Sequence, residues 1–162
     1  MRHIRTAMVM LACATVALVA CAKASDETMP LPLLDGNTAY LTDFDGQVIV
    51  LYFWASWCPP CKTTMPILQE LNNEYAEQGL VVLGVNERET ASQAQAYTEE
   101  VNVTFPIVLD KSADIANYYR LMGPPATILL GNDGEVVKQF IGVVSRDQLD
   151  EFLVPLFIDG EE

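Results

Sequence analysis

Two cysteines, Cys58 and Cys61, are separated by two prolines in the sequence Cys-Pro-Pro-Cys. Sulfurs at this spacing can form a redox pair, half of a metal site or a structural bridge. A bridge that closes so short a loop constrains the unfolded chain little. A structural zinc site needs four ligands, usually Cys or His, and the only histidine is His3 in the N-terminal segment. The pattern therefore favours a redox pair, and no metal is expected.

An expected buried strand ends just before the pair, and an expected helix follows it. Residues 48–54 form an unbroken apolar and aromatic run, which is typical of a strand buried on both faces. Beyond Cys61, apolar side chains recur at helical spacing, at Ile67, Leu68, Leu71 and Tyr75. Gly79 is expected to end this helix and Pro66 to kink it. The sequence thus places the pair at the amino end of a helix.

This position favours sulfur nucleophiles. The first helical turn has unpaired N–H groups and the positive end of the helix dipole, and both favour a thiolate at Cys58. Cys61 lies almost one turn further along on the same side, so its sulfur can reach that of Cys58. Attack by Cys58 on a partner disulfide gives a mixed disulfide, which Cys61 resolves. Because the pair itself carries the electrons, no cofactor is expected.

The two residues between the cysteines bear on the direction of exchange. Pro59 and Pro60 have no backbone N–H, so two possible donors to the Cys58 sulfur are missing. No histidine between the cysteines adds positive charge. The Cys58 thiolate should therefore be only moderately stabilised, which predicts a reducing pair.

The remaining pattern predicts an α/β fold. A short hairpin is expected at residues 31–34 and 38–41. Further strands are expected at residues 80–85, 105–109, 127–130 and 135–141, and further helices at residues 90–100, 113–119 and from 145 onward. Pro155 is expected to fray the end of the last helix. This order predicts a central mixed β-sheet flanked by helices, with an N-terminal β-hairpin extension.

Four segments carry a family resemblance. They are residues 33–36, residues 53–61 with Trp-Cys-x-x-Cys, residues 105–110, and residues 123–127 with Gly-x-Pro-x-Thr. Over residues 29–158 the sequence resembles the TlpA/ResA-like branch of the thioredoxin superfamily. The resemblance implies a thioredoxin-like fold and thiol–disulfide oxidoreductase activity.

The resemblance also implies roles for residues around the pair. Pro125 is expected to follow a cis peptide bond and to face the disulfide. The backbone of Pro124 would then be presented to a partner chain, which could pair with it by strand addition, although Pro124 has no N–H to donate. Pro59 and Pro60 would support the site. Trp57 is expected to line the surface that faces the partner.

An acidic residue is implied near the buried cysteine, at the end of the strand that follows the first helix. Glu89 is the first candidate, and it could accept the Cys61 proton during resolution. Glu87 is the alternative. The buried Asp typical of thioredoxin is absent, because Tyr52 stands at that strand position.

The N-terminal segment predicts export. Residues 1–5 are basic and residues 7–22 are apolar and small, which is a secretory signal pattern. Leu18-Val19-Ala20-Cys21 resembles a bacterial lipoprotein processing site, which implies a signal peptide at 1–20 and lipidation of Cys21 as the mature N-terminus. Residues 21–28 would be a tether and residues 29–162 the thioredoxin-like domain. Cleavage after Ala24 or an uncleaved anchor are the alternatives.

The formal net charge of −13 provides no basic patch for nucleic acid or for anionic lipid. The sequence therefore predicts an exported enzyme in the periplasm or on the outer face of a bacterial membrane. Its expected partners are disulfide or dithiol proteins and an upstream membrane donor of thiol reductant, and cytochrome c maturation is one implied pathway. A reductase is the first hypothesis. An oxidase or isomerase, and a tethered redox-gated binding module, are the alternatives.

Overall fold

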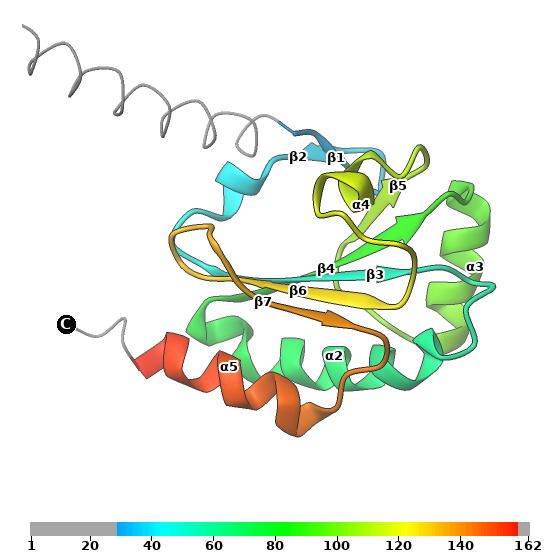
Figure 1. The fold of residues 1–162 in the computed structure, drawn as a ribbon. Coiled ribbons are helices and arrows are strands. Elements are labelled where there is room, and N and C mark those ends of the chain that lie inside the picture. Colours follow the sequence, from blue (N-terminus) through cyan, green and yellow to red (C-terminus); the bar gives the residue numbers. More distant parts are fainter. Residues whose placement is uncertain (1–28, 159–162) are drawn as a thin grey trace, which may run out of the picture.

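A five-stranded mixed β-sheet forms the centre of the protein (Figure 1). The computed structural model describes residues 29–158. The expected signal peptide at 1–20, the tether at 21–28 with Cys21, and residues 159–162 lie outside the described residues. The strands are β3 Val48–Trp54, β4 Leu80–Glu87, β5 Ile107–Asp110, β6 Ala126–Leu130 and β7 Val136–Ile141.

Strand β3 lies in the middle of the sheet order β5-β4-β3-β6-β7. All seven of its residues are buried, as the apolar run predicts for a strand covered on both faces. It pairs in parallel with β4 and antiparallel with β6. Its C-terminal end therefore lies beside the C-terminal end of β4 and the start of β6, and these three ends surround the cysteine pair.

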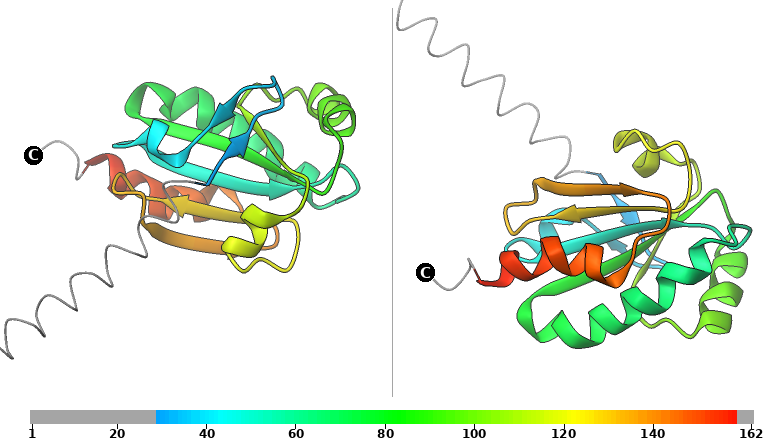
Figure 2. Two further views of the ribbon diagram at one scale, coloured as in Figure 1. Left: turned by 90° about the horizontal axis from the view of Figure 1, so that it is seen from above. Right: turned by 60° about the horizontal axis from the view of Figure 1, so that its bottom comes forward.

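Helices cover one face of the sheet, and a hairpin with a short helix covers the other. The helices of the first face are α2 Cys61–Tyr75, α3 Ala91–Val101 and α5 Arg146–Ile158. Figures 1 and 2 show α2 and α5 side by side beneath the sheet. The second face carries α4 Asp114–Tyr118 and the hairpin of β1 Leu31–Pro32 and β2 Thr38–Ala39. This arrangement confirms the predicted mixed sheet, its helical layers and the N-terminal hairpin.

The helix ends follow local signals in most places. The short 3₁₀ segments are η1 Leu41–Phe44, which follows the hairpin, and η2 Ala76–Gln78, which follows α2. Gly79, with φ of 91°, ends η2 in the left-handed region. Thr90 and Gln93 form the predicted capping box of α3. The prediction for Pro155 is wrong, because α5 continues past it to Ile158. Among residues 29–158, no helix combines the length and the apolar character that a membrane span requires.

Candidate active site

A disulfide joins Cys58 and Cys61 at the point where β3 passes into α2. The S–S distance is 2.07 Å and the Cα–Cα distance is 5.4 Å. Cys61 is the first residue of α2 and is fully buried, while Cys58 is 3% exposed. The resolving sulfur is therefore shielded, and a partner disulfide must approach from the side of Cys58.

The backbone around the pair forms a series of tight turns. The N–H of Cys58 donates to the Ala55 carbonyl at 3.1 Å, and the N–H of Cys61 donates to the Cys58 carbonyl at 3.0 Å. The N–H of Lys62 donates to the Pro59 carbonyl at 3.3 Å. The first amides of α2 are therefore already engaged with backbone carbonyls, and Pro60, the N-cap residue, has no N–H.

The peptide bond between Pro124 and Pro125 is cis. Pro125 directly precedes Ala126, which lies opposite Phe53 in the β3–β6 register. This register places the proline pair at the same end of the sheet as the cysteines. The N–H of Gly142 donates to the Pro125 carbonyl at 2.8 Å, which fixes the loop after β7 beside it.

Glu89 connects the loop before Cys58 to the end of β4. Its side chain is buried, with the residue 5% exposed. Its Oε2 accepts hydrogen bonds from the N–H of Ser56 at 2.8 Å and from Nδ2 of Asn86 at 2.7 Å, and the Ser56 hydroxyl donates to Oε1. The sequence does not predict Ser56 and Asn86 as partners of Glu89. Its only signal is that Asn86 is a polar residue at the end of an apolar strand.

Comparison with known proteins bears on this geometry. The model of the AhpC/TSA family matches residues 22–139. The chain belongs to the AhpC/TSA family. A thiol-disulfide oxidoreductase ResA from Halalkalibacterium halodurans is 34% identical over 120 residues, covering 74% of this chain and 68% of the relative.

Two solved structures share the fold of this AhpC/TSA-family chain. A putative thiol:disulfide interchange protein DsbE from Chlorobium tepidum has a TM-score of 0.74 and 27% identity, covering 80% of this chain and 92% of its own. StoA from Bacillus subtilis has a TM-score of 0.66 and 28% identity, and the match covers 76% of this chain and 94% of StoA. The chain is thus a thiol–disulfide oxidoreductase of thioredoxin-like fold whose redox group is its own cysteine pair. Among residues 29–158, no three acidic, Cys or His side chains form a metal-binding group.

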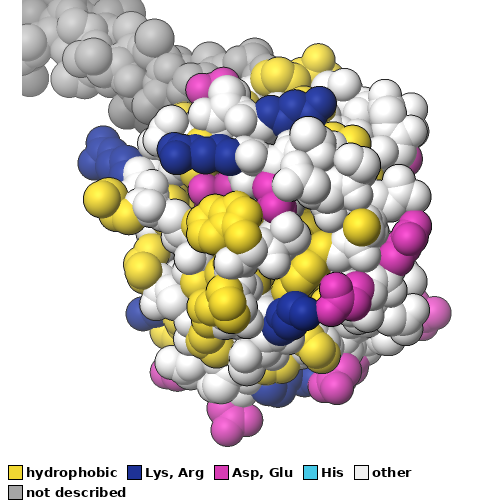
Figure 3. Space-filling view, turned by 90° about the vertical axis from the view of Figure 1, so that its right-hand side faces the viewer, with side chains coloured by type: hydrophobic (Ala, Val, Ile, Leu, Met, Phe, Trp, Pro, Cys, Tyr) yellow, Lys and Arg dark blue, Asp and Glu magenta, His cyan; other side chains and the backbone are white. Residues whose placement is uncertain are grey.

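Apolar side chains are exposed around the pair in this AhpC/TSA-family enzyme. Trp57 is 61% exposed and Met122, which lies two residues before Pro124, is fully exposed. Ile141, opposite Ala126, is 68% exposed. Figure 3 shows hydrophobic side chains gathered on the face that contains this end of the sheet, with Lys and Arg side chains above them. The exposure of Trp57 is compatible with its predicted place on the partner-facing surface, which stays a prediction, and Met122 carries no sequence pattern that marks it.

Glu87 lies on the opposite face of the sheet from the cysteines. It shares the face of Val85, two residues earlier on β4, and stands beside Asp110 on β5. It is 4% exposed. Burial raises the pKa of its carboxyl, and the nearby Asp110 charge raises it further, against a smaller opposing effect of Arg88. Asp110 itself accepts the N–H groups of residues 115 and 116 at the start of α4.

This environment predicts a pH-dependent stability. Because the pKa of Glu87 is raised in the folded state, the unfolded chain loses this proton first as the pH rises above about 4.5. The free energy of unfolding should therefore fall as the pH rises through the interval between the two pKa values. The Glu87→Gln protein cannot lose the proton, so we expect it to gain stability relative to the wild type from pH 5 to pH 8. Urea unfolding of the two proteins at pH 5 and at pH 8 measures the difference between their free energies of unfolding. An equal difference at the two pH values would contradict the prediction.

Proposed function

We propose that this oxidoreductase works as a reductant of disulfides in exported proteins. The observation that carries the proposal is the Cys58–Cys61 pair at the start of α2, whose two intervening residues are both proline. The Cys58 thiolate has few donors there, because Pro59 and Pro60 lack N–H groups and the next amides bond to carbonyls. A weakly stabilised thiolate favours the disulfide form of the enzyme and hence the reduction of partners.

The cycle proceeds by two exchange steps. The Cys58 thiolate attacks a partner disulfide, so that a Cys58–partner bond forms, the partner S–S bond breaks, and the released thiolate takes up a proton. Cys61 then loses its proton and attacks the Cys58 sulfur. The Cys58–Cys61 bond forms, and the second partner thiolate leaves and is protonated. The partner gains two electrons and two protons, while the enzyme loses the two electrons and the Cys61 proton, and solvent supplies the second proton.

Glu89 is proposed as the acceptor of the Cys61 proton. Support comes from its burial at the end of β4 and from its hydrogen bonds to Ser56, two residues before Cys58. These bonds hold the Glu89 carboxylate against the short loop that precedes Cys58. A positioned carboxylate can remove the proton that resolution must release.

Docking of the partner is proposed at the backbone of Pro124 and at the exposed side chains of Trp57 and Met122. The carbonyl of Pro124 can accept an N–H from an extended partner segment. Because Pro124 has no N–H, this pairing has one hydrogen bond fewer than a residue with an amide would give. The exposed apolar side chains on either side then contribute more of the contact.

The reducing direction predicts a reduction potential near that of thioredoxin, roughly −270 mV, and far from the about −120 mV of a strong oxidant. Lys62 supports this expectation, because its ammonium is 2.7 Å from Glu100 and its charge is partly compensated. Equilibration with glutathione buffers, followed by thiol alkylation, gives the potential. A value above about −170 mV would instead favour an oxidase or isomerase.

The location and pathway are proposed from the N-terminal sequence and the family. We infer export, lipidation at Cys21 and an envelope site of action, with reductant supplied by a membrane thiol donor. Cytochrome c maturation is the proposed pathway that the TlpA/ResA-like resemblance implies. Thiol trapping in cells with and without such a donor tests this: the pair should be mostly reduced with the donor and oxidised without it. A pair that is oxidised in both cells would contradict the reductase.

A further inference from the structure

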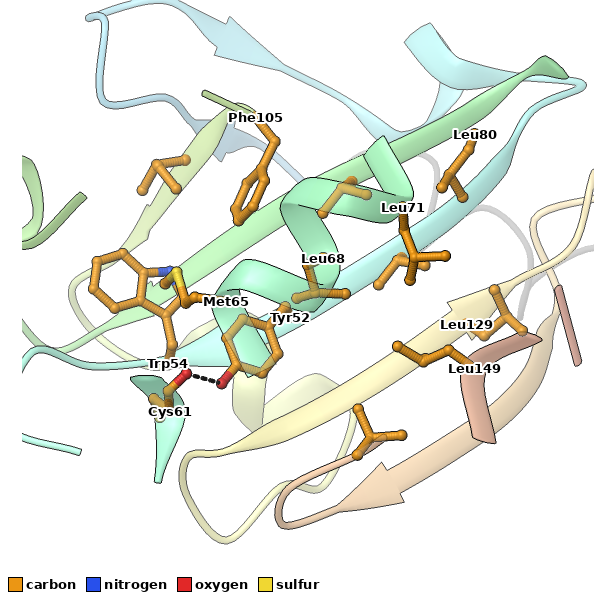
Figure 4. Packing of buried hydrophobic residues seen from close by; sticks show 14 of the residues in the cluster. Tyr52, Trp54, Cys61, Met65, Leu68, Leu71, Leu80, Phe105, Leu129 and Leu149 are labelled. Atoms are coloured by element: carbon orange, nitrogen blue, oxygen red, sulfur yellow. Dashed lines mark hydrogen bonds between the residues drawn. The ribbon is translucent and has the colours of Figure 1, made fainter. Parts of the chain in front are cut away.

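A buried tyrosine contacts the resolving cysteine. Tyr52 extends from the middle of β3 toward α2, and its hydroxyl donates a hydrogen bond to the carbonyl oxygen of Cys61 at 3.0 Å. Figure 4 shows this bond beside Trp54 and Met65 in the core. Both Tyr52 and Cys61 are fully buried, so water does not compete for the bond and its geometry is fixed by the surrounding core.

The turn that this bond holds lacks some of the main-chain N–H donors of an ordinary helical turn. Pro59 and Pro60, which precede Cys61, donate no N–H. Pro66, one turn later, supplies no N–H to the carbonyl of Lys62, which is its helical partner four residues earlier. The first turn of α2 therefore lies between prolines on both sides. The Tyr52 hydroxyl bonds to the neighbouring Cys61 carbonyl, so it adds a tertiary bond next to the carbonyl that lacks its helical donor.

We propose that Tyr52 is a positioning residue for the second step of the cycle, because its hydroxyl holds Cys61 in the orientation that attacks the mixed disulfide. The carbonyl carbon of Cys61 and the Cβ that carries its sulfur are bonded to the same Cα, so a bond that fixes the carbonyl fixes the backbone from which the sulfur is presented. A restricted thiol has a higher effective concentration toward the Cys58 sulfur. The inference rests on the proposed exchange cycle and concerns only its resolving step.

Tyr52 contributes as a donor and not as a base. Burial raises the pKa of its phenol well above the ordinary value, against a smaller opposing effect of the nearby Thr64 hydroxyl. The phenol therefore keeps its proton throughout the working pH range. In the step itself, the Cys58–Cys61 bond forms, the Cys58–partner bond breaks and the partner thiolate is protonated, while the Tyr52 hydroxyl loses nothing.

The test is Tyr52→Phe, which keeps the ring and removes the hydroxyl. The matched control is Tyr97→Phe, since Tyr97 is also buried and its hydroxyl has no hydrogen-bond partner among the described residues. Each reduced protein is mixed with a peptide disulfide, quenched with acid at intervals, and the mixed disulfide is quantified by mass spectrometry. This separates attack by Cys58 from resolution by Cys61. Wild-type turnover in the same assay tests the proposed function separately.

We expect Tyr52→Phe to attack at the wild-type rate and to resolve about three- to tenfold more slowly, the loss typical of one hydrogen bond. The equilibrium constant for closing the disulfide should fall by the same factor, which makes the potential about 14 to 30 mV more positive. Tyr97→Phe should change neither. If the bond only stabilises the fold, its removal should lower the urea midpoint of both redox forms and leave the resolution rate and the potential unchanged. That outcome overturns the proposal. If Tyr52→Phe does not fold, the pair Tyr52→Phe/Pro66→Ala is compared with Pro66→Ala in the same way.

Discussion

Cys58→Ser is expected to reduce disulfide turnover to the background rate of the reductant alone. Cys58 is the sulfur nearest the surface, and Cys61 is fully buried behind it. Cys61 is fully buried and Cys58 retains a small exposed fraction, so no other described thiol can begin the cycle. Insulin reduction driven by dithiothreitol measures the turnover.

Cys61→Ser is the matched control for this variant. It keeps the attacking sulfur and removes only the resolving one, so we expect a stable adduct between Cys58 and the partner on non-reducing gels. Cys58→Ser should form none. An adduct with Cys58→Ser, or turnover above background, would assign the first attack to another group.

Glu89→Gln is expected to slow resolution about a hundredfold at neutral pH, the size usual for loss of a positioned proton acceptor. The amide accepts no proton, so release of the Cys61 proton would depend on solvent. The resolution rate of the variant should then rise more steeply between pH 6 and pH 9 than that of the wild type. Acid-quench measurement of the mixed disulfide gives the rate at each pH.

Glu87→Gln is the matched comparison, because Glu87 is equally buried, two residues away and on the other face of the sheet. We expect its resolution rate and pH profile to equal those of the wild type. Attack by Cys58 should be unchanged in both variants. Identical profiles for Glu89→Gln and the wild type would remove Glu89 from the mechanism, and a changed profile for Glu87→Gln alone would assign its role to Glu87.

Much of the fold was predictable because local signals determine it. An unbroken apolar run of seven residues that is rich in β-branched and aromatic side chains favours a strand covered on both faces, and β3 is such a strand. The Thr90–Gln93 capping box fixes the start of α3 within the sequence itself. The Pro155 prediction was wrong because a proline removes one hydrogen bond, while packing of Phe157 against Tyr75 on α2 keeps the last turn in place.

The contacts within the site were less predictable, since they join residues far apart in the chain. Ser56 and Glu89 are 33 residues apart, and their bonds depend on the parallel pairing of β3 with β4. The bond from Tyr52 to Cys61 requires that α2 lie on one particular face of β3. Spacing in the sequence indicates candidate residues, and the sheet register determines which of them are in contact.

The most direct test of the account is a count of thiols after one turnover. Reduced enzyme is mixed with an equal amount of a protein that contains one disulfide, and the thiols of both are alkylated and located by mass spectrometry. If Cys58 and Cys61 act as one redox pair, the enzyme loses both of these thiols together and the partner gains two. A partner that is reduced while both enzyme thiols remain free would contradict it, as would a partner left fully oxidised.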